Sequence, residues 1–468
     1  MKVEILQELK PYSFNQIKRI FNKSDVSTED ILKSLGMTNI VRKINKDIQE
    51  TELEELLNIE NIEVFENESD IFVFKFVGMI VVEEVCLIIY PKYLSDYKID
   101  RDRNYSDLRQ ILKVIKKYKF KEQKIDGSGS IFSKYNLLST ALELIEDYHE
   151  NGLYRNDQQI IEVNGDGEIL WEKTINESQA YFSQNRPFYL DIFNVSQIND
   201  KDDYFRRLHA AILTDLSKKL KEIFDIINVE SLLLTDEKIE NFGSYEYINT
   251  NIDREMRTQF VTSRVEVLKL IKRYLLESES FSSNQKISFL GTSSFNLVWE
   301  DVCSVVFGNN LKTPLKELGL KYSENVKNSA LLVDVIPKPI WKSNEFNVEH
   351  SAKRTLIPDI VVVENEGIYI YDAKYYKIVL DDKKVEKQPG VEDITKQYLY
   401  ELAFKNLANE NNLEFKENSF ILPTDKEDPV HIGEVSLDFL RNLNGLNQSK
   451  IDVYLMPARE FFKRYVER

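Results

Sequence analysis

The chain has 468 residues, 42% of them hydrophobic and 30% charged, a balance typical of a globular protein with roughly two to four domains. Only 15 glycines and 11 prolines are present, so long disordered tracts are not expected. The formal net charge of −16 argues against a protein that coats nucleic acid generally, although a local basic patch can still contact phosphate.

The apolar segments of the chain predict strands and buried cysteines rather than a membrane anchor. The most apolar stretch, residues 71–90, is interrupted by charged residues, so it predicts paired strands and not a membrane span. Cys86 and Cys303 both lie inside apolar runs and predict two buried thiols, which suits a reducing cytoplasm. We therefore expect a cytoplasmic protein that does not enter a membrane.

Turn-forming sequences divide the chain into three predicted domains, and the predicted fold class is multidomain α/β (α+β). Residues 1–126 combine short helices, an acidic stretch at 47–70 and alternating strands, and an acidic domain of this kind favours a protein partner over DNA. A Gly-Ser-Gly-Ser sequence at 127–130 marks a flexible boundary, after which residues 131–250 form a second α+β domain. Residues 253–468 alternate strands with helices, which predicts a mixed sheet flanked by helices.

Two segments of the first half of the chain could serve either a binding role or a purely structural one. A helix over residues 101–124 has nine Lys or Arg against three acids, so it either tracks a phosphate backbone or lays lysine stems over the core. A glycine turn then precedes an alternating strand at 169–175, with Trp171 predicted in the core. The chain has no G-x-x-x-x-G-K-[ST] loop, so a nucleotide-driven motor acting with it would lie on another polypeptide.

An apolar helix over residues 295–307 begins the part of the chain with the strongest chemical signals. Its apolar stripe includes Trp299 and leaves Glu300 at the flank, about 100° around the helix, where a carboxylate can reach over the edge of a sheet. Residues 311–358 then carry eight Lys or Arg against five acids, and residues 374–387 carry five Lys against three acids. These basic excesses are either ordinary solvated surfaces or parts of a patch that contacts phosphate.

Residues 356–375 predict a β-hairpin, because two β-rich runs flank a turn at 364–367 whose glycine can take a left-handed conformation. A two-residue loop at the centre of this turn places Asp359 opposite Asp372 on one face of the hairpin. Lys374 then lies two residues further along the same face. A three-residue loop with a bulge at the glycine is the alternative, and it would shift the register by one.

Two carboxylates directly opposite on a sheet destabilise it by roughly 0.2–1 kcal/mol unless something compensates. A hard cation such as Mg²⁺ does so, because it binds one or two carboxylates and completes its shell with water and phosphate oxygens. The adjacent Lys374 can hold a phosphate or assist the attacking water, and this combination is the chemistry of phosphodiester hydrolysis. The alternative is an ordinary surface hairpin that happens to carry two acids and a lysine.

The sequences Pro358-Asp359 and Asp372-Ala373-Lys374 resemble the PD-(D/E)xK nuclease signature. With the following Tyr375-Tyr376, and with residues 167–175, the chain is similar to McrC-type restriction nuclease subunits and more narrowly to the LlaJI group. The resemblance implies a C-terminal restriction-endonuclease-like domain that hydrolyses double-stranded DNA with Mg²⁺, or with Mn²⁺ as the alternative ion. It also implies a GTP-hydrolysing McrB-like partner subunit that recognises DNA.

The resemblance also assigns roles to residues of the hairpin. Asp359 and Asp372 would hold the metal together with the backbone carbonyl of Ala373. Lys374 would steady the attacking hydroxide or the scissile phosphate.

Two helical residues complete the predicted site. Glu300 matches a helical Glu that commonly completes the metal shell in such nucleases. Gln397, on a helix predicted over residues 393–407, matches a supporting residue that contacts phosphate or orients the lysine. Asp393 and Tyr400 share a helix face with Gln397, since the three are spaced at i, i+4 and i+7.

The leading prediction is therefore the DNA endonuclease subunit of a McrBC/LlaJI-like restriction system. A self-contained site-specific endonuclease with DNA recognition in residues 1–250 is one alternative, although no helix-turn-helix or zinc module is recognisable there. A non-catalytic adaptor that retains the nuclease fold is another, and the complete set of two acids and a lysine argues against it.

Overall fold

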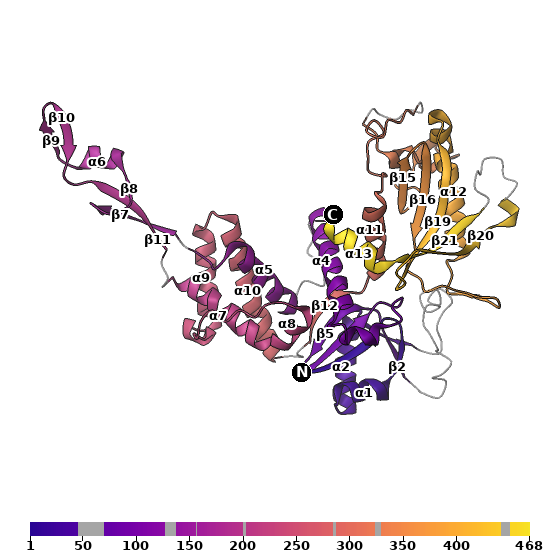
Figure 1. The fold of residues 1–468 in the computed structure, drawn as a ribbon, viewed down its shortest axis with the longest axis horizontal. Coiled ribbons are helices and arrows are strands. Elements are labelled where there is room, and N and C mark those ends of the chain that lie inside the picture. Colours follow the sequence, from indigo (N-terminus) through magenta and orange to yellow (C-terminus); the bar gives the residue numbers. More distant parts are fainter. Residues whose placement is uncertain are drawn as a thin grey trace. The chain divides into compact units, whose positions relative to one another are not determined.

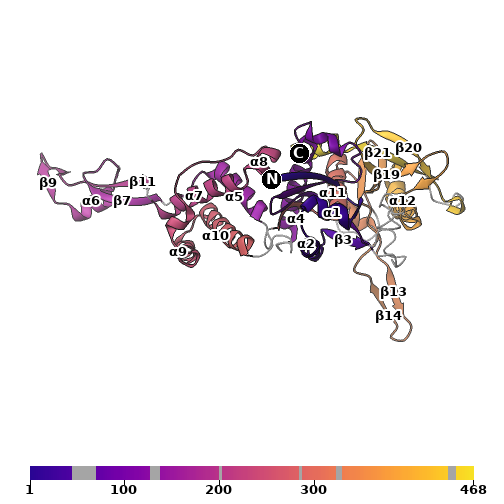
Figure 2. The same ribbon diagram turned by 90° about the horizontal axis from the view of Figure 1, so that it is seen from below.

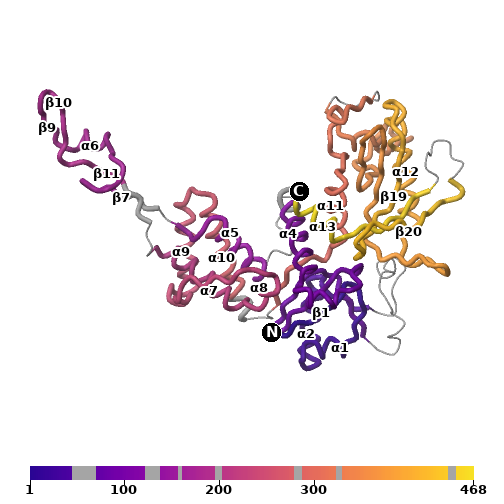
Figure 3. Tube along the Cα trace, viewed as in Figure 1, coloured from indigo at the N-terminus to yellow at the C-terminus, as the bar shows by residue number. Residues whose placement is uncertain are grey.

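The computed structural model describes residues 1–44, 70–126, 137–155, 157–199, 203–283, 287–322, 329–440 and 450–468. The chain forms two compact units, unit 1 with Met1–Lys134 and Leu290–Arg468, and unit 2 with Tyr135–Phe289. Both ends of the chain belong to unit 1, and unit 2 is inserted between them, as the trace of the chain shows (Figure 3). Within the described ranges, none of the helices has the length and hydropathy needed to cross a bilayer.

The N-terminal part of unit 1 is built on a four-stranded sheet in the order β1-β6-β5-β12. Strand β6 pairs parallel to β1 and antiparallel to β5, and every residue of β5 and β6 is buried, including Cys86. The predicted strands in the apolar stretch 71–90 are therefore confirmed. The strands of this sheet are β1 (Lys2–Gln7), β5 (Val77–Val82), β6 (Val85–Tyr90) and β12 (Ile287–Thr292).

A smaller antiparallel sheet in the order β2-β4-β3 and two helices complete this part. Ser13 caps the first helix by accepting from the N–H of Gln16, whose side chain in turn accepts from the N–H of Ser13. The predicted acidic stretch at 47–70 lies, except for Asp70, outside the described residues. The elements are β2 (Pro11–Ser13), α1 (Phe14–Phe21), α2 (Asp25–Met37), β3 (Val41–Ile44) and β4 (Ile71–Phe74).

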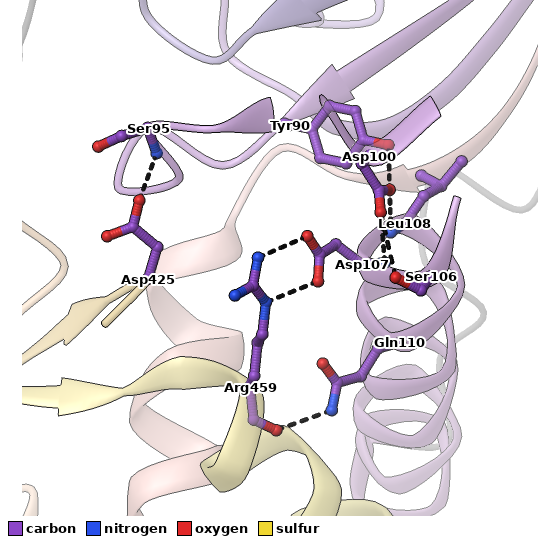
Figure 4. A network of polar contacts seen from close by, with 9 residues as sticks. All are labelled: Tyr90, Ser95, Asp100, Ser106, Asp107, Leu108, Gln110, Asp425 and Arg459. Carbon is purple, nitrogen blue, oxygen red and sulfur yellow. Dashed lines mark hydrogen bonds and ion pairs between the residues drawn. The ribbon is translucent and has the colours of Figure 1, made fainter. Parts of the chain in front are cut away.

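The predicted basic helix is α4 (Ser106–Asp126), which follows a short 3-10 helix, η2 (Tyr97–Arg101). The buried carboxylate of Asp100 caps α4, because it accepts from the backbone N–H groups of Asp107 and Leu108 at 2.9 and 3.1 Å. The hydroxyl of Tyr90 also donates to Asp100, at 2.5 Å, so the end of β6 is fixed to the start of the helix (Figure 4).

Helix α4 joins the N-terminal part of unit 1 to its C-terminal part. Arg459, at the start of α13 (Ala458–Glu467), donates two hydrogen bonds to Asp107 at 2.7 and 2.8 Å, and Gln110 donates to the Arg459 carbonyl (Figure 4). Three lysines of α4 also bond inside the unit, to the Tyr465 and Gly291 carbonyls and to Asp301. These lysines therefore join α4 to helix α13, strand β12 and helix α11 (Phe295–Phe307), which is a structural role.

The C-terminal part of unit 1 is a five-stranded mixed sheet in the order β15-β16-β19-β21-β20 (Figure 1). Strands β16, β19 and β21 are parallel to one another, and β15 and β20 are antiparallel at the two edges. The predicted mixed sheet is therefore confirmed. Its strands are β15 (Ile360–Glu364), β16 (Gly367–Ala373), β19 (Glu414–Thr424), β20 (Val430–Val435) and β21 (Ile451–Pro457).

Two helices cover opposite faces of this sheet. On one face Tyr371 of β16 stacks on Phe307 of α11 (Phe295–Phe307), with ring centroids 4.5 Å apart. The neighbouring Ile370 points the other way, into a core that includes Phe404 of α12 (Val391–Asn411). Shorter elements of this part are η5 (Leu332–Val335), β13 (Ile340–Ser343), β14 (Val348–Ser351), β17 (Val379–Leu380), β18 (Val385–Glu386) and η6 (Asp438–Leu440).

Unit 2 has a helical core and extended strands. The core is formed by buried residues of α5, α7, α8, α9 and α10, and its members include Leu144, Ile212 and Ile271. The helices are α5 (Leu137–Asn151), α7 (Tyr204–Lys219), α8 (Lys221–Ile227), η4 (Ile239–Phe242), α9 (Tyr245–Thr258) and α10 (Thr262–Ser283). The other elements are β7 (Asp157–Val163), β8 (Glu168–Ile169), α6 (Trp171–Glu177), β9 (Ala180–Ser183), β10 (Arg186–Tyr189) and β11 (Phe193–Asn199).

Two expectations for unit 2 differ from the structure. The predicted strand at 169–175 is wrong beyond Ile169, because Trp171 begins helix α6 and is 55% exposed. The segment packs through Thr174 instead, which is fully buried and accepts from the N–H of Phe193 at 3.0 Å. The predicted start of the third domain at residue 253 also differs, because the apolar side of α10 belongs to the core of unit 2.

Candidate active site

The hairpin of β15 and β16 has the predicted two-residue loop. Asn365 and Glu366 both have a left-handed backbone, with φ of 49° and 60°, as a type I′ turn requires. Glu364 therefore pairs with Gly367, and Ile360 pairs with Tyr371. The three-residue loop is excluded, and the left-handed residues are Asn365 and Glu366 rather than the glycine.

This register brings the two predicted acids together. Asp359 directly precedes β15, so the pairing of Ile360 with Tyr371 places it opposite Asp372. Asp359 Oδ2 accepts a hydrogen bond from the N–H of Ala373 at 3.0 Å, which holds the two strands together at this end. Asp372 lies near the carboxyl end of β16, the end at which parallel strands of α/β sheets carry their ligands.

Burial is the main cause of the raised pKa of both aspartates. Burial and the nearby charges of Asp372 and Glu300 together raise the pKa of Asp359 to about 7, against the opposing effect of Lys374. Burial also raises the pKa of Asp372, which is only 5% exposed, although Lys374 opposes the shift. Two negative charges in this place are therefore costly unless a cation joins them.

Glu300 of α11 lies within electrostatic reach of the same group. The pKa of Glu300 is raised to about 7, mainly by burial, with the charge of Lys374 lowering it and that of Asp372 raising it. The predicted position at the flank of the helix therefore brings Glu300 toward the hairpin. Its role as a metal ligand stays a prediction.

Lys374 is held between two carboxylates. Its Nζ lies 2.9 Å from Asp372 Oδ2 and 3.1 Å from Asp393 Oδ1, in the first turn of α12. Burial would lower the pKa of Lys374, but Asp372, Asp393 and Asp359 together raise it above its usual range. The amine therefore stays protonated at neutral pH. The sequence placed Asp393 on the face of Gln397 but did not identify it as a partner of the lysine.

Gln397 is fully buried one turn further along α12, and its contacts differ from the expected ones. Its Nε2 donates to the Ser419 carbonyl at 3.4 Å, and Asn418 Nδ2 donates to the Gln397 carbonyl at 3.2 Å. These bonds fix α12 to β19. In the described residues Asp393, and not Gln397, contacts Lys374, and a role of Gln397 toward phosphate stays a prediction.

The residue after the lysine reaches the N-terminal part of unit 1. The hydroxyl of Tyr375 donates to the buried carboxylate of Glu8, which also accepts from the N–H of Lys92 at 3.2 Å. The Lys92 ammonium lies 4.6 Å from the centroid of the Tyr375 ring. Tyr375 also packs edge to face against Tyr93. No sequence motif indicated this cluster, because Glu8 and Lys92 follow two strands far from the hairpin in sequence.

The site offers few protein ligands for a metal ion. In the ranges that the structure describes, no three His, Cys, Asp or Glu side chains are grouped so that they alone could hold a metal ion. Mg²⁺ usually needs only one or two carboxylates, since water and phosphate complete its shell. The opposed carboxylates of Asp359 and Asp372 meet that requirement. The Ala373 carbonyl and Glu300 stay predicted ligands.

The fold and site thus define a mixed α/β protein with two acids and a lysine gathered at one end of a hairpin. The chain belongs to the LlaJI restriction endonuclease family, whose model matches residues 76–457. The match covers most of the chain and includes part of the N-terminal sheet, and the predicted family is confirmed. A similar protein is the type II restriction enzyme BsuMI component YdjA of Bacillus subtilis (strain 168), 29% identical over 419 residues. The alignment covers 86% of this chain and 83% of that protein.

Two solved structures are weakly similar to the chain. One is a refined half-complex from a tetradecameric assembly of Thermococcus gammatolerans McrB AAA+ hexamers with bound McrC, with a TM-score of 0.39 and 14% identity. It covers 100% of this chain and 99% of that one. The other is a cryo-EM structure of the Thermococcus gammatolerans McrBC complex, with a TM-score of 0.22 and 13% identity over 60% of this chain and 87% of that one. Both scores are too low to establish a shared fold.

Proposed function

We propose that this chain is the DNA-cleaving subunit of a restriction system and that its C-terminal part is a Mg²⁺-dependent nuclease of the PD-(D/E)xK type. The observation that carries the proposal is the hairpin register, which places Asp359 opposite Asp372 with Lys374 bound beside them. Family membership supplies the class of reaction, and the residues supply the site.

The two aspartates and the lysine would have different roles in hydrolysis. Asp359 and Asp372 would hold Mg²⁺, which when bound supplies Lewis-acid polarisation of the phosphate and a more acidic water. Asp372 and Asp393 keep Lys374 protonated and fix its Nζ beside the carboxylates. The ammonium would stabilise the charge that develops on the phosphate as water adds to phosphorus and one P–O ester bond breaks. A protonated lysine favours this electrostatic role over that of a general base.

A cleavage assay tests the proposal. The full chain, with any partner it requires, is incubated with plasmid DNA and Mg²⁺, and cut products are measured over time. We expect Asp372→Asn and Lys374→Met to abolish cutting, while Asp334→Asn, an acid of the 3-10 helix η5, cuts as the wild type does. Full activity of the Asp372→Asn variant would contradict the assignment.

The proposed partner is a McrB-like GTPase, and the proposed substrate is double-stranded DNA. The chain has no phosphate-binding loop of its own, and the similar Bacillus subtilis protein is named as one component of a restriction enzyme. Co-purification followed by a GTPase assay tests the partner: stimulation of GTP turnover by this chain supports it, and unchanged turnover contradicts it.

A further inference from the structure

The hairpin of β13 and β14 exposes apolar side chains on both of its faces. Trp341 and Phe346 are 72% and 70% exposed, and Ile340 and Val348 are also exposed. A two-stranded hairpin is marginally stable at best when nothing packs on it, and Figure 2 shows these strands extending away from the sheets of unit 1. Several large apolar side chains exposed on one short hairpin favour a contact surface.

Charge distinguishes this hairpin from the exposed aromatic hairpin of β9 and β10. Residues 337–357 carry four basic groups, Lys338, Lys342, Lys353 and Arg354, against two glutamates, in a chain whose net charge is −16. Lys342 pairs with Glu349 across the strands at 2.5 Å, and the other three basic residues lie exposed at the base. By contrast, the aromatic hairpin of β9 and β10 lies in residues 177–191, which carry one arginine against two acids. The basic hairpin is therefore suited to a polyanion.

The base of the hairpin is tied close to the proposed catalytic acids. Thr355 Oγ1 donates to the Pro337 carbonyl and the Ala352 N–H donates to the Pro339 carbonyl, each at 2.7 Å, so these bonds close the base. Only three residues lie between Thr355 and Asp359, so their Cα atoms are at most about 14 Å apart. Duplex DNA carries about one phosphate charge per 1.7 Å of its axis, so that span displays several phosphates. DNA lying at Asp359 passes within reach of the basic residues.

We propose that the β13–β14 hairpin binds the DNA duplex beside the cleavage site, an inference that rests on the proposed nuclease function. Lys338, Lys353 and Arg354 contact phosphates at the base of the hairpin. Trp341 and Phe346 supply apolar contacts to sugars and base edges in a groove, as apolar side chains do in proteins that grip a widened minor groove. The hairpin thereby holds the duplex while Asp359, Asp372 and Lys374 act on one phosphate.

Binding of the full chain to a fluorescent 30-base-pair duplex, measured by anisotropy in EDTA over a series of salt concentrations, tests the inference without cleavage. Each phosphate contact contributes about 0.9 to the slope of log affinity against log salt. The triple variant Lys338→Gln, Lys353→Gln, Arg354→Gln is expected to lower that slope by about 2 to 3. Trp341→Ser is expected to weaken binding about tenfold with no change of slope.

Matched variants control for loss of charge and of aromatic surface elsewhere. A triple change of exposed lysines on three other helices, Lys33→Gln, Lys218→Gln and Lys463→Gln, and the change of exposed Phe260→Ala should bind as the wild type does. Unchanged slope and affinity in both hairpin variants would overturn the inference, as would no measurable binding by the wild type at low salt.

The alternative that the hairpin binds a second copy of the chain is tested by measuring self-association in sedimentation experiments. If Trp341→Ser abolished self-association of the chain and left DNA binding unchanged, the hairpin would bind a second copy and the inference would be wrong. The nuclease proposal has a separate outcome, because it depends on loss of cleavage in Asp372→Asn, whatever the hairpin variants do.

Discussion

The hydroxyl of Tyr375 donates a hydrogen bond to the carboxylate of Glu8, so the residue after Lys374 is anchored to the end of strand β1. Glu8 and Lys92 are themselves buried, and burial raises the pKa of the Glu8 carboxyl while Lys92 opposes that shift. The N-terminal sheet therefore fixes the position of the residue that follows the Asp372-Ala373-Lys374 segment. A displacement of this sheet would move Tyr375 and the adjacent lysine with it.

Tyr375→Phe is expected to destabilise unit 1 by about 1–3 kcal/mol, because the buried Glu8 carboxylate loses a hydrogen-bond donor. Cleavage should also slow several-fold, since Lys374 is less well fixed. Urea unfolding and the cleavage rate are the measurements. Tyr369→Phe is the control, because the Tyr369 side chain is only partly buried and its ring stacks on that of Tyr371. Equal stability of the two variants would contradict this role of Tyr375.

Asp393→Asn is expected to lower the cleavage rate about tenfold, which corresponds to roughly 1.4 kcal/mol of transition-state free energy. The change removes one of the two carboxylates that hold the Lys374 ammonium, and bonds to charged groups contribute on the order of 1.5–3 kcal/mol.

The preceding residue provides a matched control for this variant. Glu392→Gln removes a carboxylate that is exposed and pairs with Lys396, so its cleavage rate should stay at the wild-type value. Equal rates for the Asp393 and Glu392 variants would mean that Asp393 does not position the lysine.

Without divalent ions, the free energy of unfolding is expected to fall as the pH rises from about 6.5 to 8. Burial raises the pKa of Asp359 from 3.8 to about 7, so between these values the folded chain binds a proton that the unfolded chain has lost. Stability therefore decreases as the pH rises through the folded pKa, and Glu300 contributes with the same sign. The pKa of His209 is lowered by burial from 6.5 to about 4, so most of its opposite contribution is already present at pH 6.5, and the small remainder is outweighed by the two carboxyl groups.

Thermal unfolding in EDTA at several pH values measures this dependence. Asp359→Asn should reduce the fall in melting temperature, and Mg²⁺ should raise the melting temperature more at pH 8 than at pH 6.5. A wild-type melting temperature that rises from pH 6.5 to 8 would contradict the proposed burial of the carboxylates.

Local patterns in the sequence predicted the hairpin and much of the site. The β-rich runs around the turn predicted the hairpin, and of the two loops that the sequence left open the structure has the two-residue loop, which pairs Asp359 with Asp372. The helical spacing around Trp299 likewise placed Glu300 beside the hairpin. Both predictions rest on short-range geometry.

Contacts between distant segments could not be predicted in the same way. Nothing in the sequence near Glu8 or Lys92 indicates that they meet Tyr375, since these contacts depend on how two sheets pack in unit 1. Trp171 was misplaced for a similar reason. Its alternating neighbours predict a strand, but the buried Thr174 and its bond to Phe193 favour a helix in the folded chain.

The central claim is that Asp359 and Asp372 hold a divalent cation at the point where DNA is cut. A crystal of the chain grown with duplex DNA and Mn²⁺, with Lys374→Met to prevent cleavage, allows the ion to be located from its anomalous scattering. We predict a peak at coordination distance from a carboxylate oxygen of each aspartate and from a DNA phosphate oxygen. Mn²⁺ bound elsewhere, with Asp359 and Asp372 making no contact to it, would contradict the account.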